Sequence, residues 1–122
     1  MNRTILIVED DETIRENLRE ILEMENFSVL EAENGKIALE KLRRLASDKN
    51  PLPFVILLDL NMPVMSGREF LIAQRADQTV VARIPVVVTT AAPDASDLGT
   101  FGFLRKPIDL DHLLEKLQQL VS

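Results

Sequence analysis

Residues 4–11 read Thr4-Ile5-Leu6-Ile7-Val8-Glu9-Asp10-Asp11, and this stretch decides the fold class. A nearly unbroken run of β-branched and apolar residues gives way, within one position, to three acids. A continuous apolar run of this length is typical of a strand that is buried on both faces of a sheet. The stretch therefore predicts a parallel sheet with helices on both sides, and a polar turn directly after its first strand.

Similar runs recur along the chain. Residues 54–58 are entirely apolar and end at Asp59, and residues 85–89 form a third run that ends near Thr90. Shorter strands are expected at residues 27–32 and 103–105. Five strands separated by segments of other character indicate an α/β protein.

Helical periods fill most of the intervals between these strands. Asn34, Ser66 and Asp109 stand where helix N-caps are needed, and residues 67–76 form the helix expected after Ser66. Apolar residues at intervals of three and four give each helix a buried side. The stripe expected to face the core in the last helix consists of Leu110, Leu113, Leu114, Leu117 and Leu120.

The composition excludes several classes of protein. The chain has 122 residues, enough for one domain over residues 1–122, and we expect no effector domain in it. There is no cysteine and only one histidine, His112, which excludes disulfides, thiol catalysis and metal sites built from cysteine or several histidines. The net charge of −6 disfavours direct nucleic-acid binding. No segment predicts a signal peptide or membrane insertion, so we expect a cytoplasmic protein.

Polar residues of unlike chemistry follow four of the expected strands. They are Glu9 and Asp10, then Asp59, Thr90 and Lys106. In an open parallel sheet the functional crevice lies beyond the carboxyl ends of the strands. Singly, each residue reads as a helix cap or a solvated turn. Together they predict one site in which neighbouring carboxylates need a proton or a hard cation such as Mg²⁺, Mn²⁺ or Ca²⁺.

The sequence resembles the receiver domain of two-component response regulators, in particular the chemotaxis-type regulators that consist of this domain alone. Four segments carry the resemblance, in the order of the family: Ile5 to Glu12, Leu57 to Pro63, Ile84-Pro85 with Thr90-Ala91, and Phe103 to Pro107. The resemblance implies a flavodoxin-like, doubly wound, five-stranded parallel sheet with strand order 2-1-3-4-5.

The resemblance also implies a magnesium site. Asp10 and Asp59 would ligate Mg²⁺, or Mn²⁺ in its place, together with the backbone carbonyl of Asn61. Glu9, where family members often have aspartate, would hold the metal through water.

A phosphorylation site and a switch follow from the same resemblance. Asp59 would accept a phosphoryl group from the phosphohistidine of a sensor histidine kinase or a histidine phosphotransfer protein. Lys106 would pair with that group, and Thr90 would move toward it. Phe103 would rotate inward in the active state and change the binding of a downstream protein target. Such a domain is not an enzyme, because it catalyses only its own phosphorylation and dephosphorylation.

Three departures from the family pattern are visible. The segment from Thr90 to Gly99 is shorter than usual by more than one helical turn, which predicts a shortened or irregular fourth helix. Residues 47–53 form an extended loop. Position 103 carries phenylalanine rather than tyrosine and so lacks a phenolic hydroxyl.

Three other functions fit parts of the pattern. A receiver-like module could bind partners without being phosphorylated. A Mg²⁺-dependent aspartyl phosphatase of the haloacid-dehalogenase type would need an acid two residues after its nucleophile, where this chain has Asn61. A flavodoxin-like FMN carrier would need a phosphate-binding loop after the first strand, where residues 9–12 are all acidic.

Overall fold

The computed structural model describes residues 2–91 and 98–121. Its centre is one parallel sheet with strand order β2-β1-β3-β4-β5, which confirms the predicted order. The strands are β1 (Thr4–Val8), β2 (Ser28–Ala32), β3 (Val55–Asp59), β4 (Val86–Thr90) and β5 (Gly102–Arg105). The observed strands start and end within two residues of the apolar runs.

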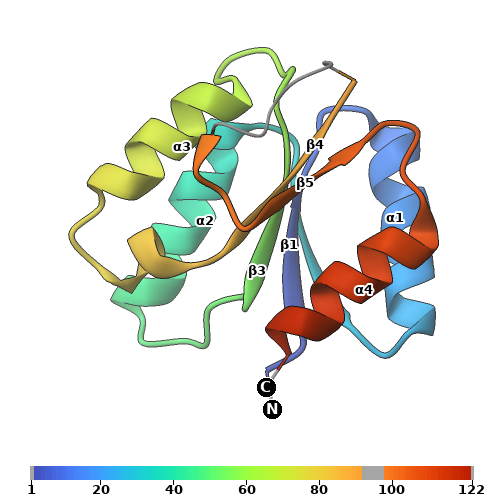
Figure 1. The fold of residues 1–122 in the computed structure, drawn as a ribbon. Helices are drawn as coiled ribbons and strands as arrows, with labels where there is room; N and C mark the ends of the chain where they lie inside the picture. Colours follow the sequence, from blue (N-terminus) through green and yellow to red (C-terminus); the bar gives the residue numbers. More distant parts are fainter. Residues whose placement is uncertain (1, 92–97, 122) are drawn as a thin grey trace.

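Helices cover both faces of this sheet (Figure 1). The helices are α1 (Glu12–Met24), α2 (Gly35–Ser47), α3 (Gly67–Ala76) and α4 (Leu110–Leu120), with a short 3₁₀ helix η1 (Val80–Arg83) before β4. In Figure 1, α2 and α3 lie on one face and α1 and α4 lie on the other. The three-layer arrangement is the one that the alternation of strands and helices predicts.

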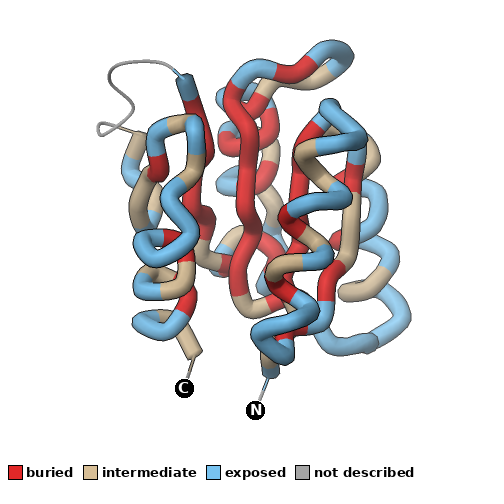
Figure 2. The backbone as a smooth tube through the Cα atoms, turned by 90° about the vertical axis from the view of Figure 1, so that its right-hand side faces the viewer, coloured by how far each residue is buried: buried red, intermediate tan, exposed pale blue. Residues whose placement is uncertain are grey.

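The core consists of two clusters separated by the sheet. Leu6 and Val8 of β1 pack with the buried residues of α2 and α3, whereas Ile5 and Ile7 pack with those of α1 and α4. Successive side chains of a strand point to opposite faces, so one apolar run supplies both clusters. Figure 2 shows the strands as the most continuously buried part of the backbone.

Side-chain caps fix where the helices begin. Asn34 accepts a hydrogen bond from the backbone N–H of Ile37 at the start of α2. Ser66 and Glu69 form a reciprocal capping box at the start of α3. The predicted caps of α2, α3 and α4 are therefore confirmed, and Asp11 caps α1 in the same way.

Three details differ from the sequence prediction. Leu110 is 38% exposed, because the first residue of α4 lies beyond the edge of the core. Gln74 is buried although polar, since its amide donates hydrogen bonds of 3.0 Å to the carbonyl oxygens of Val81 and Ile84. The helix η1 was not predicted, and the Gln74 side chain ties it to α3.

The short or irregular helix predicted between Thr90 and Gly99, which is not α4, falls on a segment that the structure describes only at its ends. Residues 92–97 lie outside the described residues, so the helix stays a prediction. Gly99 adopts a φ of +69°, the left-handed conformation that a C-terminal capping glycine needs.

Candidate functional site

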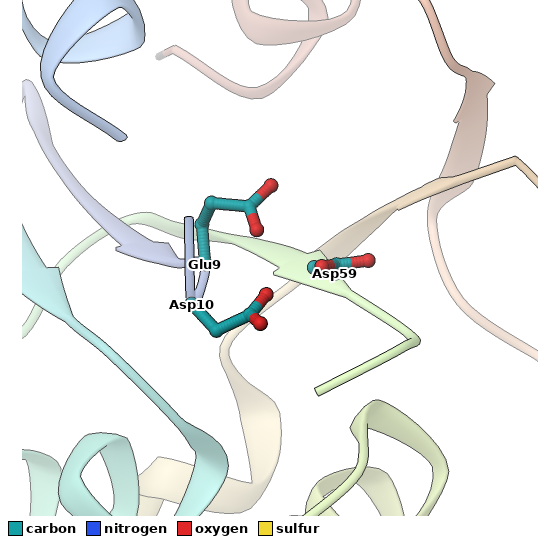
Figure 3. A group of neighbouring side chains, drawn as sticks. All are labelled: Glu9, Asp10 and Asp59. Carbon is teal, nitrogen blue, oxygen red and sulfur yellow. The ribbon is translucent and has the colours of Figure 1, made fainter. Parts of the chain in front are cut away.

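Three carboxylates meet at the carboxyl ends of β1 and β3. Glu9 and Asp10 directly follow β1, and Asp59 is the last residue of β3, its neighbour in the sheet. Each residue offers one oxygen, and these oxygens lie within 4.8 Å of one another. Figure 3 shows the side chains of Glu9 and Asp10 extending toward Asp59. The structure thus brings together the three acids that the sequence predicts at one edge of the sheet, and their shared function stays a prediction.

The carboxylates differ in their access to solvent. Glu9 and Asp59 are each only 3% exposed, whereas Asp10 is exposed. Carboxylate oxygens of this number and spacing match the ligands that Mg²⁺ prefers, and the exposed side leaves room for water or a phosphate oxygen. The donor set therefore fits a hard divalent cation.

Lys106 adds a positive charge to the cluster. It directly follows β5, the strand at one side of the sheet. Its Nζ lies 3.0 Å from Oε1 of Glu9 and 3.4 Å from Oδ2 of Asp59. Its backbone N–H donates a 2.8 Å hydrogen bond to the carbonyl of Thr90, which fastens the residue after β5 to the end of β4. The Lys106-Pro107 peptide bond is cis.

The pKa values of Glu9 and Lys106 are both raised, but burial acts in opposite directions on the two groups. Burial raises the pKa of Glu9 to about 7, and the proximity of Asp59 adds to the rise, although the hydrogen bonds from Lys106 and the Asp11 N–H oppose it. Burial also disfavours the charged form of Lys106. The hydrogen bond and charge of Glu9, with those of Asp59, outweigh this effect and hold the pKa of Lys106 above its ordinary value.

The loop after β3 is fastened to Asp59. The backbone N–H of Asn61 donates a 3.1 Å hydrogen bond to Oδ1 of Asp59, and the N–H of Leu60 donates to the carbonyl of Thr89. Asn61 itself is exposed. Its predicted role as a carbonyl ligand stays a prediction.

Gly67 lets α3 begin against this loop. A Cβ atom at position 67 would lie 2.5 Å from the carbonyl oxygen of Asp59 and 2.6 Å from Cα of Leu60. Both are backbone atoms, so a side chain here would displace the residue at the centre of the site. Close backbone approach is a use to which glycine is suited.

The two expected switch residues lie on β4 and β5, in different surroundings. Thr90 ends β4 and is fully buried. Phe103 lies on β5, is half-buried and packs against the cluster beneath α2 and α3. Their roles in switching stay predictions.

Arg15 was not among the predicted site residues. Its Nη1 donates a 2.8 Å hydrogen bond to the backbone carbonyl of Glu9, and its Nε lies 3.3 Å from Oε1 of Glu31. The sequence gives no pattern that would single it out, because only the packing of α1 beside β2 brings these groups together.

A family model described as the response regulator receiver domain matches residues 5–118. The chain belongs to this family. It is a receiver domain of two-component signalling, and the cluster of Glu9, Asp10 and Asp59 is consistent with a phosphorylation site. Members of the family typically act in signalling rather than as enzymes.

Known proteins resemble this receiver domain along its whole length. The response regulator MprA of Mycolicibacterium vanbaalenii is 33% identical over 96% of this chain, which covers 49% of that protein. The chain thus spans about half the length of the curated relatives it matches, and NarP of Escherichia coli (37% identical) is covered to 53%.

Solved structures agree with the fold. The chemotaxis protein CheY4 of Vibrio cholerae superposes with a TM-score of 0.83 at 29% identity, covering 99% of this receiver domain and 100% of that chain. The response regulator TrrA of Thermotoga maritima, solved in complex with Mg²⁺-BeF, gives a TM-score of 0.81 at 30% identity with the same coverage. In the described part of the chain, no helix has the length and apolar character needed to span a membrane.

Proposed function

We propose that this receiver domain accepts a phosphoryl group on Asp59 from the phosphohistidine of a sensor histidine kinase or a histidine phosphotransfer protein. One observation carries the proposal: the nearly buried Asp59 carboxylate lies beside two further carboxylates and the ammonium group of Lys106. The domain would therefore act as a phosphorelay receiver in the cytoplasm, with residues 1–122 as one unit.

The residues in and beside the cluster would have different roles in the phosphoryl transfer. A carboxylate oxygen of Asp59 attacks phosphorus, a new O–P bond forms, and the P–N bond to the donor histidine breaks with its electron pair remaining on the imidazole nitrogen. Lys106, 3.4 Å from Asp59, would pair with an oxygen of the transferred group. The Asn61 N–H, bonded to Asp59 Oδ1, holds the carboxylate in place.

Mg²⁺ is the cofactor that this donor set fits. Asp10 and Asp59 would hold it directly, Glu9 through water, and the backbone carbonyl of Asn61 would add a ligand, with Mn²⁺ as an alternative metal. When bound, the metal would neutralise charge on the carboxylates and on the phosphoryl oxygens. Without a cation, Glu9 and Asp59 share the single charge of Lys106.

The output of the transfer would be a change in partner binding. Thr90, buried at the end of β4, would move toward the phosphoryl group, and Phe103 would turn inward against the cluster beneath α2 and α3. A downstream protein would then recognise the altered surface around β5.

The donor would dock beside the site. A groove of about 550 Å³ lies between α1 and the segment after β5, and Ile14, Leu18, Ile21 and Ile108 are among its lining residues. Lys106 also lines this groove, so a protein seated there would lie next to the cluster. This position supports α1 as the surface for the histidine kinase.

Acetyl phosphate tests the proposal without the cognate kinase. With Mg²⁺ present, intact-mass measurement should show one added phosphoryl group on the protein and none on Asp59→Asn. Asp48→Asn, at an exposed carboxylate that ends α2, is the matched control and should be modified normally. If the wild type gains no mass, or if Asp59→Asn still gains it, the proposal is wrong.

The same experiment, together with a phosphate-release assay on phosphomonoesters, separates the alternatives. A module that binds partners without phosphorylation would gain no mass under any condition. A phosphatase would release phosphate from many phosphomonoesters over repeated turnovers. Asn61 stands where such an enzyme needs its second acid, which argues against that function.

A further inference from the structure

Arg15 connects the turn that carries Glu9 and Asp10 to the edge strand of the sheet. From the first turn of α1, its guanidinium reaches the Glu9 carbonyl at 2.8 Å and the Glu31 carboxylate of β2 at 3.3 Å. The Arg15 side chain is only 15% exposed. A charge-assisted hydrogen bond in this setting is less screened than one on an open surface.

The bond to Glu9 acts on the backbone and not on a carboxylate. The Glu9 carbonyl belongs to the peptide unit that joins Glu9 to Asp10, so its direction sets where the Asp10 side chain starts. The N–H of Glu9 is fixed separately, by a 3.1 Å hydrogen bond to the carbonyl of Ala32. The N–H of Glu9 is thus held by β2, and its carbonyl oxygen is held by Arg15.

Glu31 in turn holds Arg15. Its two carboxylate oxygens take different cations: Oε1 faces Arg15, and Oε2 accepts a 2.6 Å hydrogen bond from Nη1 of Arg19. Arg19 lies one helical turn after Arg15 and also pairs with Glu23, but it makes no contact with Glu9 among the bonds of the described residues. The two arginines share Glu31 as a partner, but Arg15 bonds to the Glu9 carbonyl where Arg19 pairs with Glu23.

We propose that Arg15, oriented by Glu31, is a positioning residue for the divalent-metal site. It does not touch the metal or the phosphoryl group; it fixes the peptide between Glu9 and Asp10 so that both carboxylates face Asp59. The proposal deepens the proposed function and rests on the metal site described there.

Direct Mg²⁺ binding tests this role. In isothermal titration calorimetry, Arg15→Ala should bind Mg²⁺ about tenfold more weakly than the wild type, an effect typical of residues that orient metal ligands. Arg19→Ala is the matched control and should stay within about twofold of the wild type, because the metal-site turn keeps its bond. Arg15→Lys, which keeps the charge, should recover part of the affinity.

The rate of phosphorylation by acetyl phosphate gives a second readout. The concentration of Mg²⁺ needed for half the maximal rate should rise in Arg15→Ala, while the rate at saturating Mg²⁺ stays close to that of the wild type. Thermal unfolding of each metal-free variant shows whether the chain is folded during the assay. A general loss of structure would instead lower the saturated rate and leave the half-saturating concentration unchanged.

The outcomes separate this inference from the proposed function. If Asp10→Asn binds Mg²⁺ as the wild type does, the metal site itself is wrong. If Asp10→Asn loses binding but folded Arg15→Ala retains full affinity, or if Arg19→Ala loses as much, only the role of Arg15 is wrong. If Arg15→Ala does not fold, the comparison of Arg15→Lys with Arg19→Ala decides in the same way.

Discussion

Lys106 donates a 3.0 Å hydrogen bond to Glu9, a residue 97 positions away in the sequence. The bond joins the end of β5 to the end of β1 although β3 and β4 separate these strands in the sheet. Because Lys106 also lies 3.4 Å from Asp59, one cation serves two buried carboxylates. The ionisation of Glu9 therefore decides how strongly the cluster attracts a second cation.

Mg²⁺ affinity should depend on pH through Glu9. The pKa of Glu9 is raised to about 7, chiefly by burial, and the negative charge of its ionised form attracts the metal that Glu9 would hold through water. Affinity should therefore rise with pH and level off above about 7, and fall by up to about tenfold per pH unit below it. Calorimetric titrations across this range measure the effect.

Glu9→Gln is the control for that pH dependence. It should bind Mg²⁺ more weakly and with an affinity that changes little near neutral pH. The metal-free wild type should also lose stability as the pH rises from about 4.5 through about 7, since the folded chain holds the Glu9 proton more tightly than the unfolded chain. Equal Mg²⁺ affinities at either end of this interval would contradict the prediction.

Gly67→Ala should destabilise the domain. The added Cβ would meet the backbone of Asp59 and Leu60 at 2.5 and 2.6 Å, and neither atom can turn away. We expect the free energy of unfolding in urea to fall by about 1–3 kcal/mol. Gly102→Ala is the matched control: its Cβ would meet the mobile end of Lys116 at 2.9 Å, so the change should stay within about 0.5 kcal/mol.

Val64→Asn should stabilise the loop after β3. Val64 has a φ of +68°, which is unfavourable for a β-branched residue, and it is 75% exposed, so little packing is lost on replacement. Asparagine tolerates this conformation, and we expect a gain of about 1 kcal/mol in urea denaturation. Val80→Asn removes another exposed valine, 54% exposed in η1, at an ordinary φ. A gain at Val80 as large as that at Val64 would show that backbone strain is not the cause.

Asp77→Asn should destabilise the connection between α3 and η1. Asp77 accepts hydrogen bonds from the hydroxyl and the N–H of Thr79, which lower its pKa, and the nearby Arg43 adds to this. We expect a loss of about 1 kcal/mol near neutral pH.

The loss should disappear in acid. A carboxylate with a lowered pKa stabilises the fold above its unfolded pKa of about 3.8, and that contribution declines as the pH falls through the lower folded value. Urea denaturation of the two proteins at neutral and acidic pH measures it. A difference between wild type and variant that is the same at both pH values would be inconsistent with ionisation as the cause.

The strands were predictable because their residues follow simple rules, whereas their order was implied by the resemblance to the receiver family. Unbroken runs of β-branched and apolar residues such as residues 4–8 mark strands that are covered on both faces. Ser66 with Glu69 marks a helix start by chemistry that acts over a single turn. Features that depend on distant partners were not predictable in this way. The amide of Gln74 can be buried because it donates hydrogen bonds to the carbonyl oxygens of Val81 and Ile84.

Some residues of the candidate site were predictable from the sequence, and others depend on the tertiary fold. The sequence placed Glu9, Asp10, Asp59 and Lys106 at strand ends, and parallel strands bring such ends together. Arg15 could not be found, since its long side chain could point in many directions and its two partners lie on segments that only the tertiary fold aligns. The sequence therefore indicates the charged residues of the cluster more readily than it indicates Arg15, which bonds to the backbone beside them.

The sheet separates the two clusters of buried residues. Phe103 packs on the side of α2 and α3, whereas Leu18 and Ile108 belong to the side of α1 and α4. A rearrangement around Phe103 would change the packing beneath α2 and α3, on the face opposite to the groove lined by Leu18 and Ile108. The proposed donor surface on α1 and the residue expected to switch therefore lie on opposite faces of the sheet, so a donor and a downstream protein would approach the domain from different sides.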